Sequence, residues 1–145
     1  MENPGIFDLG SAQVSAAVSD VVITNGTTSA GVAQSLIDRL QGMMSVSLFA
    51  KFTYGSGGTS CTAVVQTSLN QGADWIDIAR FDFATSNSQK SVNISAQAAS
   101  AVAAVAALSS EGKLDGILGD RLRAKITTDG TYAGNTSLSI RACVR

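Results

Sequence analysis

The sequence contains no histidine among its 145 residues. Histidine is the usual general base at neutral pH, the usual activator of a serine nucleophile and the commonest metal ligand. Its absence excludes a Ser-His-Asp triad, although serine is abundant. Nothing in the sequence singles out one of the lysines for a Ser-Lys pair. We therefore expect no catalytic residues and no enzyme activity.

Two local patterns have the residue types of binding or catalytic sites. Residues 55–60, Gly-Ser-Gly-Gly-Thr-Ser, have the glycines of a phosphate-binding loop but lack its lysine and the helix that follows. We interpret them as a hairpin loop. Acids surround Trp75, as in some sugar sites, but Asp77 and Asp82 are five residues apart and would point to opposite faces of a strand. We interpret these two residues and Asp74 as surface acids.

Metal and cofactor sites are not indicated either. Cys61 and Cys143 are too far apart in sequence to form a metal clip, and we predict two reduced thiols. Asp115 and Asp120 lack the alternating ligands and the closing glutamate of a calcium loop. We expect no metal and no cofactor.

Basic residues are concentrated at the C-terminal end. The chain has a net charge of −1, which gives no general attraction for nucleic acid or for an anionic membrane. Residues 121–145, however, contain five basic residues and one acid. If the last two predicted strands form a hairpin, the basic residues share one outward face. That face is either a solvated surface that discourages edge aggregation or a docking surface for an acidic partner. The residues are Arg121, Arg123, Lys125, Arg141 and Arg145.

Short alternating segments dominate the rest of the chain. We predict strands over residues 45–54, 61–69, 75–83, 91–95, 121–128 and 136–144. In the third of these, Trp75, Asp77, Ala79, Phe81 and Phe83 share one face. Regularly spaced short strands separated by turn residues are typical of sandwiches and jelly rolls. The prediction is an all-β fold: an antiparallel, jelly-roll-like β-sandwich that forms a single domain over residues 18–145.

Three segments fit this pattern less well. Residues 1–17 contain Ile6, Phe7 and Leu9 outside any period, and we predict an N-terminal arm that packs on its own sandwich or reaches a neighbour. Residues 35–43 are long enough to form one or two helical turns. Residues 96–108 contain eight alanines, with valines three apart, and both a short helix and an extended connection remain open.

The composition favours an assembled protein. Hydrophobic residues make up 45% of the chain and charged residues only 14%, so much of the surface must be small and weakly hydrated. Such a surface is easily buried against a partner. The sequence has no run of 18 apolar residues, and its first residues lack the pattern of a signal peptide, so we expect folding in a cytoplasm.

Two stretches carry a family resemblance. Residues 54–83, with Tyr-Gly-Ser-Gly-Gly-Thr-Ser and Trp-Ile-Asp-Ile-Ala, and residues 115–134, with Asp-Gly-Ile-Leu-Gly-Asp-Arg-Leu-Arg and Gly-Thr-Tyr-Ala-Gly, resemble small virion proteins encoded among the head genes of tailed phages. The alanine-rich residues 96–108 depart from that family.

The resemblance implies a capsid decoration or cement protein. Such a protein would be made in the host cytoplasm, lie on the capsid surface of the virion and form a homodimer or homotrimer. It would bind the major capsid protein without contacting nucleic acid or membrane directly. Our candidate interface for that partner consists of Ile6, Phe7, Leu9, Arg121, Arg123, Lys125, Arg141 and Arg145.

Two other functions remain as alternatives. A head–tail connector or tail-tube protein would form a ring that residues 96–110 could line. A carbohydrate-binding module would use Trp75, Tyr54 and Tyr132 on one face of the sandwich.

Overall fold

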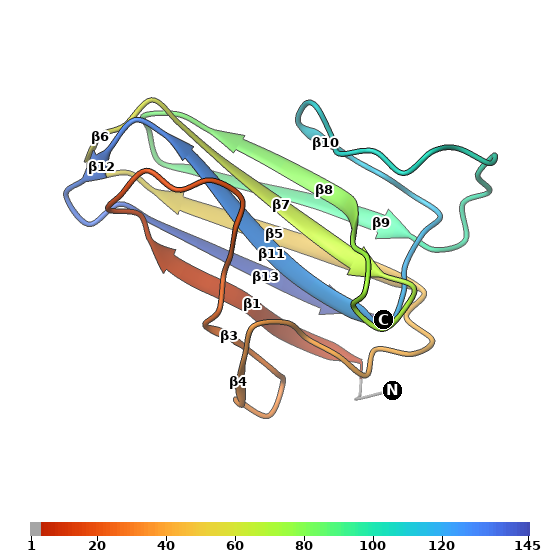
Figure 1. Cartoon of the computed structure of the whole chain (residues 1–145). Coiled ribbons are helices and arrows are strands. Elements are labelled where there is room, and N and C mark those ends of the chain that lie inside the picture. Colours follow the sequence, from red (N-terminus) through yellow and green to blue (C-terminus); the bar gives the residue numbers. More distant parts are fainter. Residues whose placement is uncertain (1–3) are drawn as a thin grey trace.

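The computed structural model describes residues 4–145, which form two packed antiparallel sheets without any helix (Figure 1). The six-stranded sheet has the order β4 (Ala33–Gln34), β3 (Gly26–Thr27), β1 (Gly5–Gln13), β13 (Ser137–Val144), β5 (Ser45–Thr53) and β9 (Ser88–Ser95). The five-stranded sheet has the order β10 (Gly112–Lys113), β8 (Ile76–Phe83), β7 (Ser60–Ser68), β11 (Arg121–Asp129) and β2 (Val21–Val22). A small two-stranded sheet of β12 (Tyr132–Ala133) and β6 (Ser56–Gly57) lies at one end.

The strand pairs are nested within one another along the chain. β1 pairs with β13, β2 with β11, β5 with β9, and β7 with β8. The first of these eight strands thus pairs with the last, the second with the seventh, and so on inward. This nesting, distributed over two facing sheets, is the strand order of a jelly roll. The prediction of an antiparallel β-sandwich is confirmed.

The core lies between the sheets and is built by strict alternation. In β5, Val46, Leu48, Ala50 and Phe52 are buried, and the residues between them face outward. β13 and β11 repeat this pattern. Because side chains of a strand point alternately to the two faces, each strand contributes one apolar row to the core and one polar row to the surface.

The segment predicted as an arm is largely a strand of the sandwich. β1 pairs with β13 along its whole length and with β3 at Asp8. Phe7 and Leu9 are buried in the core, whereas Ile6 points outward. Gly10, with a φ of 136°, lies at an irregularity in the pairing, which breaks the alternation that the sequence would otherwise show.

A β-bulge changes which face the acids of β8 occupy. Val65 pairs with Ala79 but Gln66 pairs with Asp77, so Ile78 is an extra residue in β8. Ile78 and Ala79 are both buried in the core, and Asp77 joins Arg80 and Asp82 on the outer face. The prediction that Asp77 shares a face with Ala79, and is opposite to Asp82, is therefore wrong.

Neither segment considered for a helix forms one. In residues 35–43, Ile37 makes an isolated antiparallel bridge with Leu122. Residues 96–108 are irregular and projecting (Figure 1). Their alanines favour a helix intrinsically, but a short isolated helix is marginal in water without a packing surface.

Candidate functional site

The basic residues near the C-terminus do not share one face. β11 belongs to the five-stranded sheet and β13 to the six-stranded sheet, so the two strands do not form a hairpin. Arg121, Arg123 and Lys125 project from one side of the sandwich, and Arg141 and Arg145 from the other. The structure thus divides the predicted basic surface into two parts with different surroundings.

The basic residues of β11 are engaged within the chain. Lys125 Nζ lies 2.7 Å from Asp20 Oδ1, and Arg121 Nε lies 3.5 Å from Asp120 Oδ1. Arg123 Nε donates to Gln66 Oε1 at 2.8 Å, and its guanidinium stacks 4.1 Å from the centre of the Trp75 ring. Burial lowers the pKa of Arg123, although an arginine remains charged at neutral pH. These three residues therefore serve the fold more than a partner.

The outer side of the six-stranded sheet carries small polar side chains, chiefly serines, together with four charged and two exposed apolar ones, and we call it the serine face. Register places Asp8, Arg141, Phe49 and Ser91 in one row across four strands. Phe49 is 41% exposed, and Ile6 is 62% exposed in the next row. No ion pair involves Arg141 or Arg145 in residues 4–145. The face includes Ile6, Asp8, Ser45, Ser47, Phe49, Lys51, Ser91, Asn93, Ser137, Ser139, Arg141, Cys143 and Arg145.

The three apolar residues of the predicted arm are likewise divided, in this case between the core and the surface. Phe7 and Leu9 are inside the core and cannot touch a partner. Ile6 lies on the serine face, opposite Cys143 of β13. Of the eight candidate interface residues, Ile6, Arg141 and Arg145 are thus together on one open surface.

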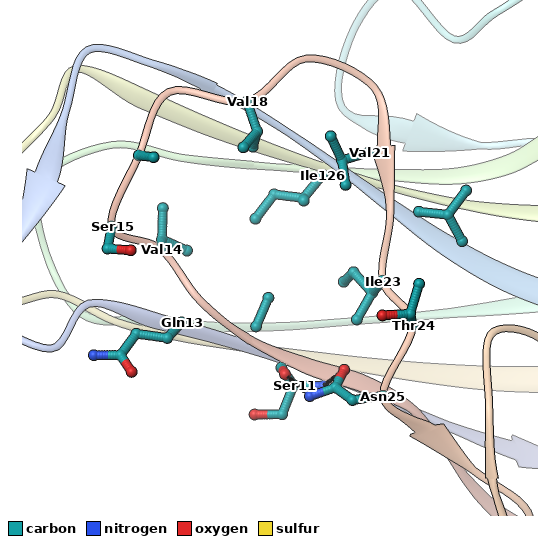
Figure 2. Close-up of a pocket in the computed structure, with 13 residues that line it drawn as sticks. Ser11, Gln13, Val14, Ser15, Val18, Val21, Ile23, Thr24, Asn25 and Ile126 are labelled. Atoms are coloured by element: carbon teal, nitrogen blue, oxygen red, sulfur yellow. Dashed lines mark hydrogen bonds between the residues drawn. The ribbon is translucent and has the colours of Figure 1, made fainter.

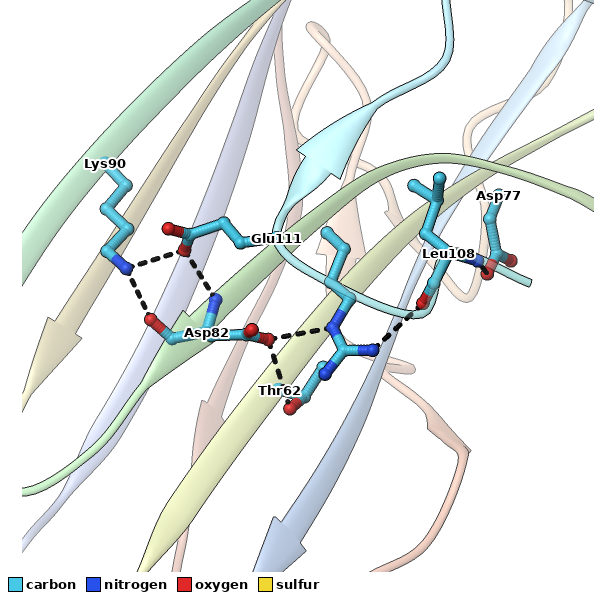
Figure 3. A network of polar contacts seen from close by, with 7 residues as sticks. Thr62, Asp77, Asp82, Lys90, Leu108 and Glu111 are labelled. Carbon is cyan, nitrogen blue, oxygen red and sulfur yellow. Dashed lines mark hydrogen bonds and ion pairs between the residues drawn. The ribbon is translucent and has the colours of Figure 1, made fainter.

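A polar network on the outer face of β8 holds the loop between β9 and β10 at Leu108 (Figure 3). This anchoring is not predicted from the sequence. Asp77 Oδ1 accepts from Gln66 Nε2 at 2.6 Å, and Asp77 Oδ2 accepts from the Leu108 amide at 3.1 Å. Arg80 Nη1 donates to the Leu108 carbonyl at 2.9 Å and its Nε pairs with Asp82 at 2.8 Å. Both the backbone amide and the backbone carbonyl of Leu108 are therefore hydrogen-bonded to side chains of β8. The bulge that turns Asp77 outward makes this possible.

Glu111 extends the network to the neighbouring edge. Its Oε2 accepts from Lys90 Nζ at 2.6 Å and from the Asp82 amide at 2.8 Å, as Figure 3 shows. Lys90 and the Asp82 amide lower the pKa of Glu111 below its ordinary value. The side chains of Glu111 and Lys90 cover the edge of β8 at Asp82, where β10 does not pair with it. Covering this edge discourages the addition of another strand.

The start of the loop is fastened as well. Ser95 donates its amide to Asp115 Oδ1 at 3.0 Å, and the Gly116 amide donates to the Ser95 carbonyl at 2.7 Å. The bond from Ser95 and the nearby Lys113 lower the pKa of Asp115. A side chain at Gly116 would collide with Ala98 and Ser100, so glycine allows the chain to close here.

Between these two anchors, residues 97–107 are all exposed and project from the sandwich (Figure 1). We call them the projecting loop. It contains no charged residue, and Val102 is fully exposed while Val105 is 68% exposed. Exposed apolar side chains on a fastened loop are typical of a segment that is covered by a partner.

An uncharged hollow of about 430 Å³ lies where the chain passes from β1 to β2 (Figure 2). Val14, Val18, Val21, Ile23 and Ile126 point into the space that residues 14–24 encircle. Ser11, Gln13 and Asn25 lie along its lower rim in Figure 2. None of its thirteen lining residues is charged.

The three aromatic residues proposed for sugar binding do not form one exposed surface. Tyr132 is buried, with its hydroxyl donating to the Ala84 carbonyl at 2.8 Å. Tyr54 packs edge-on against Tyr132 at 6.2 Å. Trp75 precedes β8 at the opposite end of the five-stranded sheet and is covered by Arg123. The predicted aromatic platform is therefore not formed.

The described residues contain no group of three or more metal-ligating side chains. Cys61 and Cys143 are both free thiols, as the sequence indicates. Burial raises the pKa of Cys61 to about 12, so this thiol is inert at neutral pH.

Comparison with known protein families and with curated proteins finds no match for this chain. Over residues 4–145 the structure has no helix that is long and apolar enough to cross a membrane.

Proposed function

We propose that this chain is a non-enzymatic structural protein of a tailed-phage virion, a decoration or cement protein that bridges and stabilises major capsid subunits. The serine face is the observation that carries this proposal. Five of its residues are serines, whose small uncharged side chains lose less hydration when covered than charged side chains do. Its exposed Phe49 and Ile6 supply apolar contact, and Arg141 and Arg145, which form no ion pair within residues 4–145, supply attraction to an acidic partner.

Because the contact would be repeated on a capsid lattice, a face that binds weakly would be sufficient for stable attachment. Each contact is weak because the face has few apolar side chains, but many identical contacts across capsid subunits add to a stable layer. The jelly-roll sandwich supplies a rigid plate between those contacts. The mechanism we propose is mechanical: the protein binds neighbouring capsid subunits and so resists internal DNA pressure.

Attachment of purified protein to undecorated capsids tests the proposal. Phe49→Asp and Arg141→Glu should each reduce the bound fraction at least tenfold, because they place a negative charge on the docking face. Leu69→Asp and Arg39→Glu are matched controls, since they make the same changes at exposed positions outside that face. Full attachment of the Phe49 and Arg141 variants, with all four variants folded, would contradict the proposal.

A head–tail connector or tail-tube protein is the second candidate, and the projecting loop is the observation that favours it. A ring of subunits could direct residues 97–107 towards its centre. Rings contribute few copies to a particle and decoration layers contribute hundreds, so copy number separates the two.

A further inference from the structure

We infer that the projecting loop of one copy inserts Val102 into the hollow between β1 and β2 of a second copy, so that the protein assembles head to tail. This inference goes beyond the proposed function and is independent of the capsid. It concerns a contact between copies of this chain, whereas the proposed function rests on the serine face.

The two surfaces have matching chemistry. The projecting loop exposes valines and alanines and carries no charge. Eight of the thirteen residues that line the hollow are valines, isoleucines or alanines, five are uncharged polar residues, and none is charged. The nearest acid on the loop that forms the hollow, Asp20, is already paired with Lys125. Joining the surfaces therefore buries apolar groups on both sides and leaves no charge unpaired, which is the favourable case for association.

The geometry excludes insertion within one copy. The loop begins after Ser95, which pairs with Ser45 at the start of β5. The hollow is beside Gln13, which pairs with Ser137, and Ser137 pairs with Thr53 at the end of β5. Loop and hollow are thus at opposite ends of the sandwich, about 25 Å apart at the usual rise of a strand.

The loop is too short and too firmly fastened to span that distance. Its two ends are held at Ser95 and Leu108. A doubled-back segment of this length extends about 20 Å at most. Only a second copy can therefore bring a hollow to the loop. Each copy then has one free loop and one free hollow, so the contact is heterologous and yields a ring or an open chain.

The fixed anchors of the loop favour binding. The Leu108 amide donates to Asp77, Arg80 donates to the Leu108 carbonyl and the Ser95 amide donates to Asp115, so the loop is restricted before any partner arrives. Less conformational freedom is then lost on association than for an unrestrained segment.

Sedimentation of the purified protein over a range of concentrations tests the inference. We expect the wild type to show species larger than the monomer. Val102→Asp on the loop and Val21→Asp at the hollow should each raise the dissociation constant at least tenfold. Val32→Asp is the matched control, because this valine is 56% exposed and belongs to neither surface.

Mixing the two variants gives the decisive result. The Val102→Asp protein keeps an intact hollow and the Val21→Asp protein keeps an intact loop, so an equimolar mixture should form a one-to-one dimer and nothing larger. A wild type that stays monomeric, or a mixture that stays monomeric while the wild type associates, would overturn the inference. Circular dichroism confirms that each variant is folded. Capsid attachment through the serine face is measured separately, so the proposed function and the loop–hollow contact can each be refuted without the other.

Discussion

Asp77 shows how one side chain can connect a strand to a distant loop. Its carboxylate accepts from Gln66 and from the Leu108 amide and is almost fully buried. Replacing it with alanine leaves both donors without a partner, so Asp77→Ala should lower the free energy of unfolding by about 1–3 kcal/mol. Denaturant unfolding measures this. Asp129→Ala, at an exposed position, should change it by less than about 0.5 kcal/mol, and equal losses in the two variants would refute the role of Asp77.

Glu111 makes the stability of the fold depend on acid pH. Its pKa is lowered in the folded chain by Lys90 and the Asp82 amide. A carboxyl whose pKa is depressed by folding stabilises the native state above its ordinary pKa, and that contribution is lost as the pH falls through the folded value. The Glu111→Gln variant should therefore lose less stability than the wild type when the pH falls below about 4.5. Unfolding curves between neutral and acid pH check this, and parallel pH profiles would count against it.

The two thiols should differ in reactivity. Cys61 is buried with a pKa of about 12, whereas Cys143 is partly exposed on the serine face. A thiol reagent should label Cys143 in the native protein, and label Cys61 only after unfolding. Mass spectrometry of the labelled chain identifies the modified residue. Native labelling of Cys61 at a similar rate would contradict the burial that the structure shows.

At the scale of elements, β1 contains two neighbouring residues with very different exposure. Phe7 is part of the core and Ile6 is exposed beside it. Phe7→Ala should cost about 3–5 kcal/mol of stability, as for other buried aromatics, while Ile6→Ala should cost less than about 0.5 kcal/mol. Thermal or denaturant unfolding distinguishes them. Similar small effects of both substitutions would mean that residues 5–13 are a peripheral arm after all.

Most strands were predictable because their period is visible in the sequence. The segments predicted at 45–54, 61–69, 121–128 and 136–144 match β5, β7, β11 and β13 within one or two residues. The two misassigned features lack a clean period for physical reasons. Pairing is irregular at Gly10 in β1, and Ile78 is inserted as a bulge in β8, so both break the two-residue alternation.

The candidate surfaces were harder to predict, because they depend on which sheet each strand joins. Arg141 and Arg121 look alike in sequence, but β13 and β11 lie in different sheets. The hydrogen bonds that fasten the projecting loop connect residues 31 and 28 positions apart in sequence. No local pattern signals such contacts.

At the scale of the whole molecule, the sandwich has distinct surfaces. The outer face of the five-stranded sheet is occupied by its own polar network, and the two ends carry the loop and the hollow. In the function we propose, the serine face would dock to the capsid. A protein that covers a capsid needs such a division, since contacts to the shell and contacts between copies must not compete. The same division predicts that Phe49→Asp abolishes attachment to capsids without changing self-association.

The copy number of this protein in purified virions, relative to the major capsid protein, tests the central claim most directly. Quantitative mass spectrometry of the particles measures it. The account predicts a ratio near one or a simple fraction of one, because a decoration layer repeats with the capsid lattice. A ratio of a few per cent would indicate a connector or tail protein instead, and absence from the particle would contradict a role in the virion.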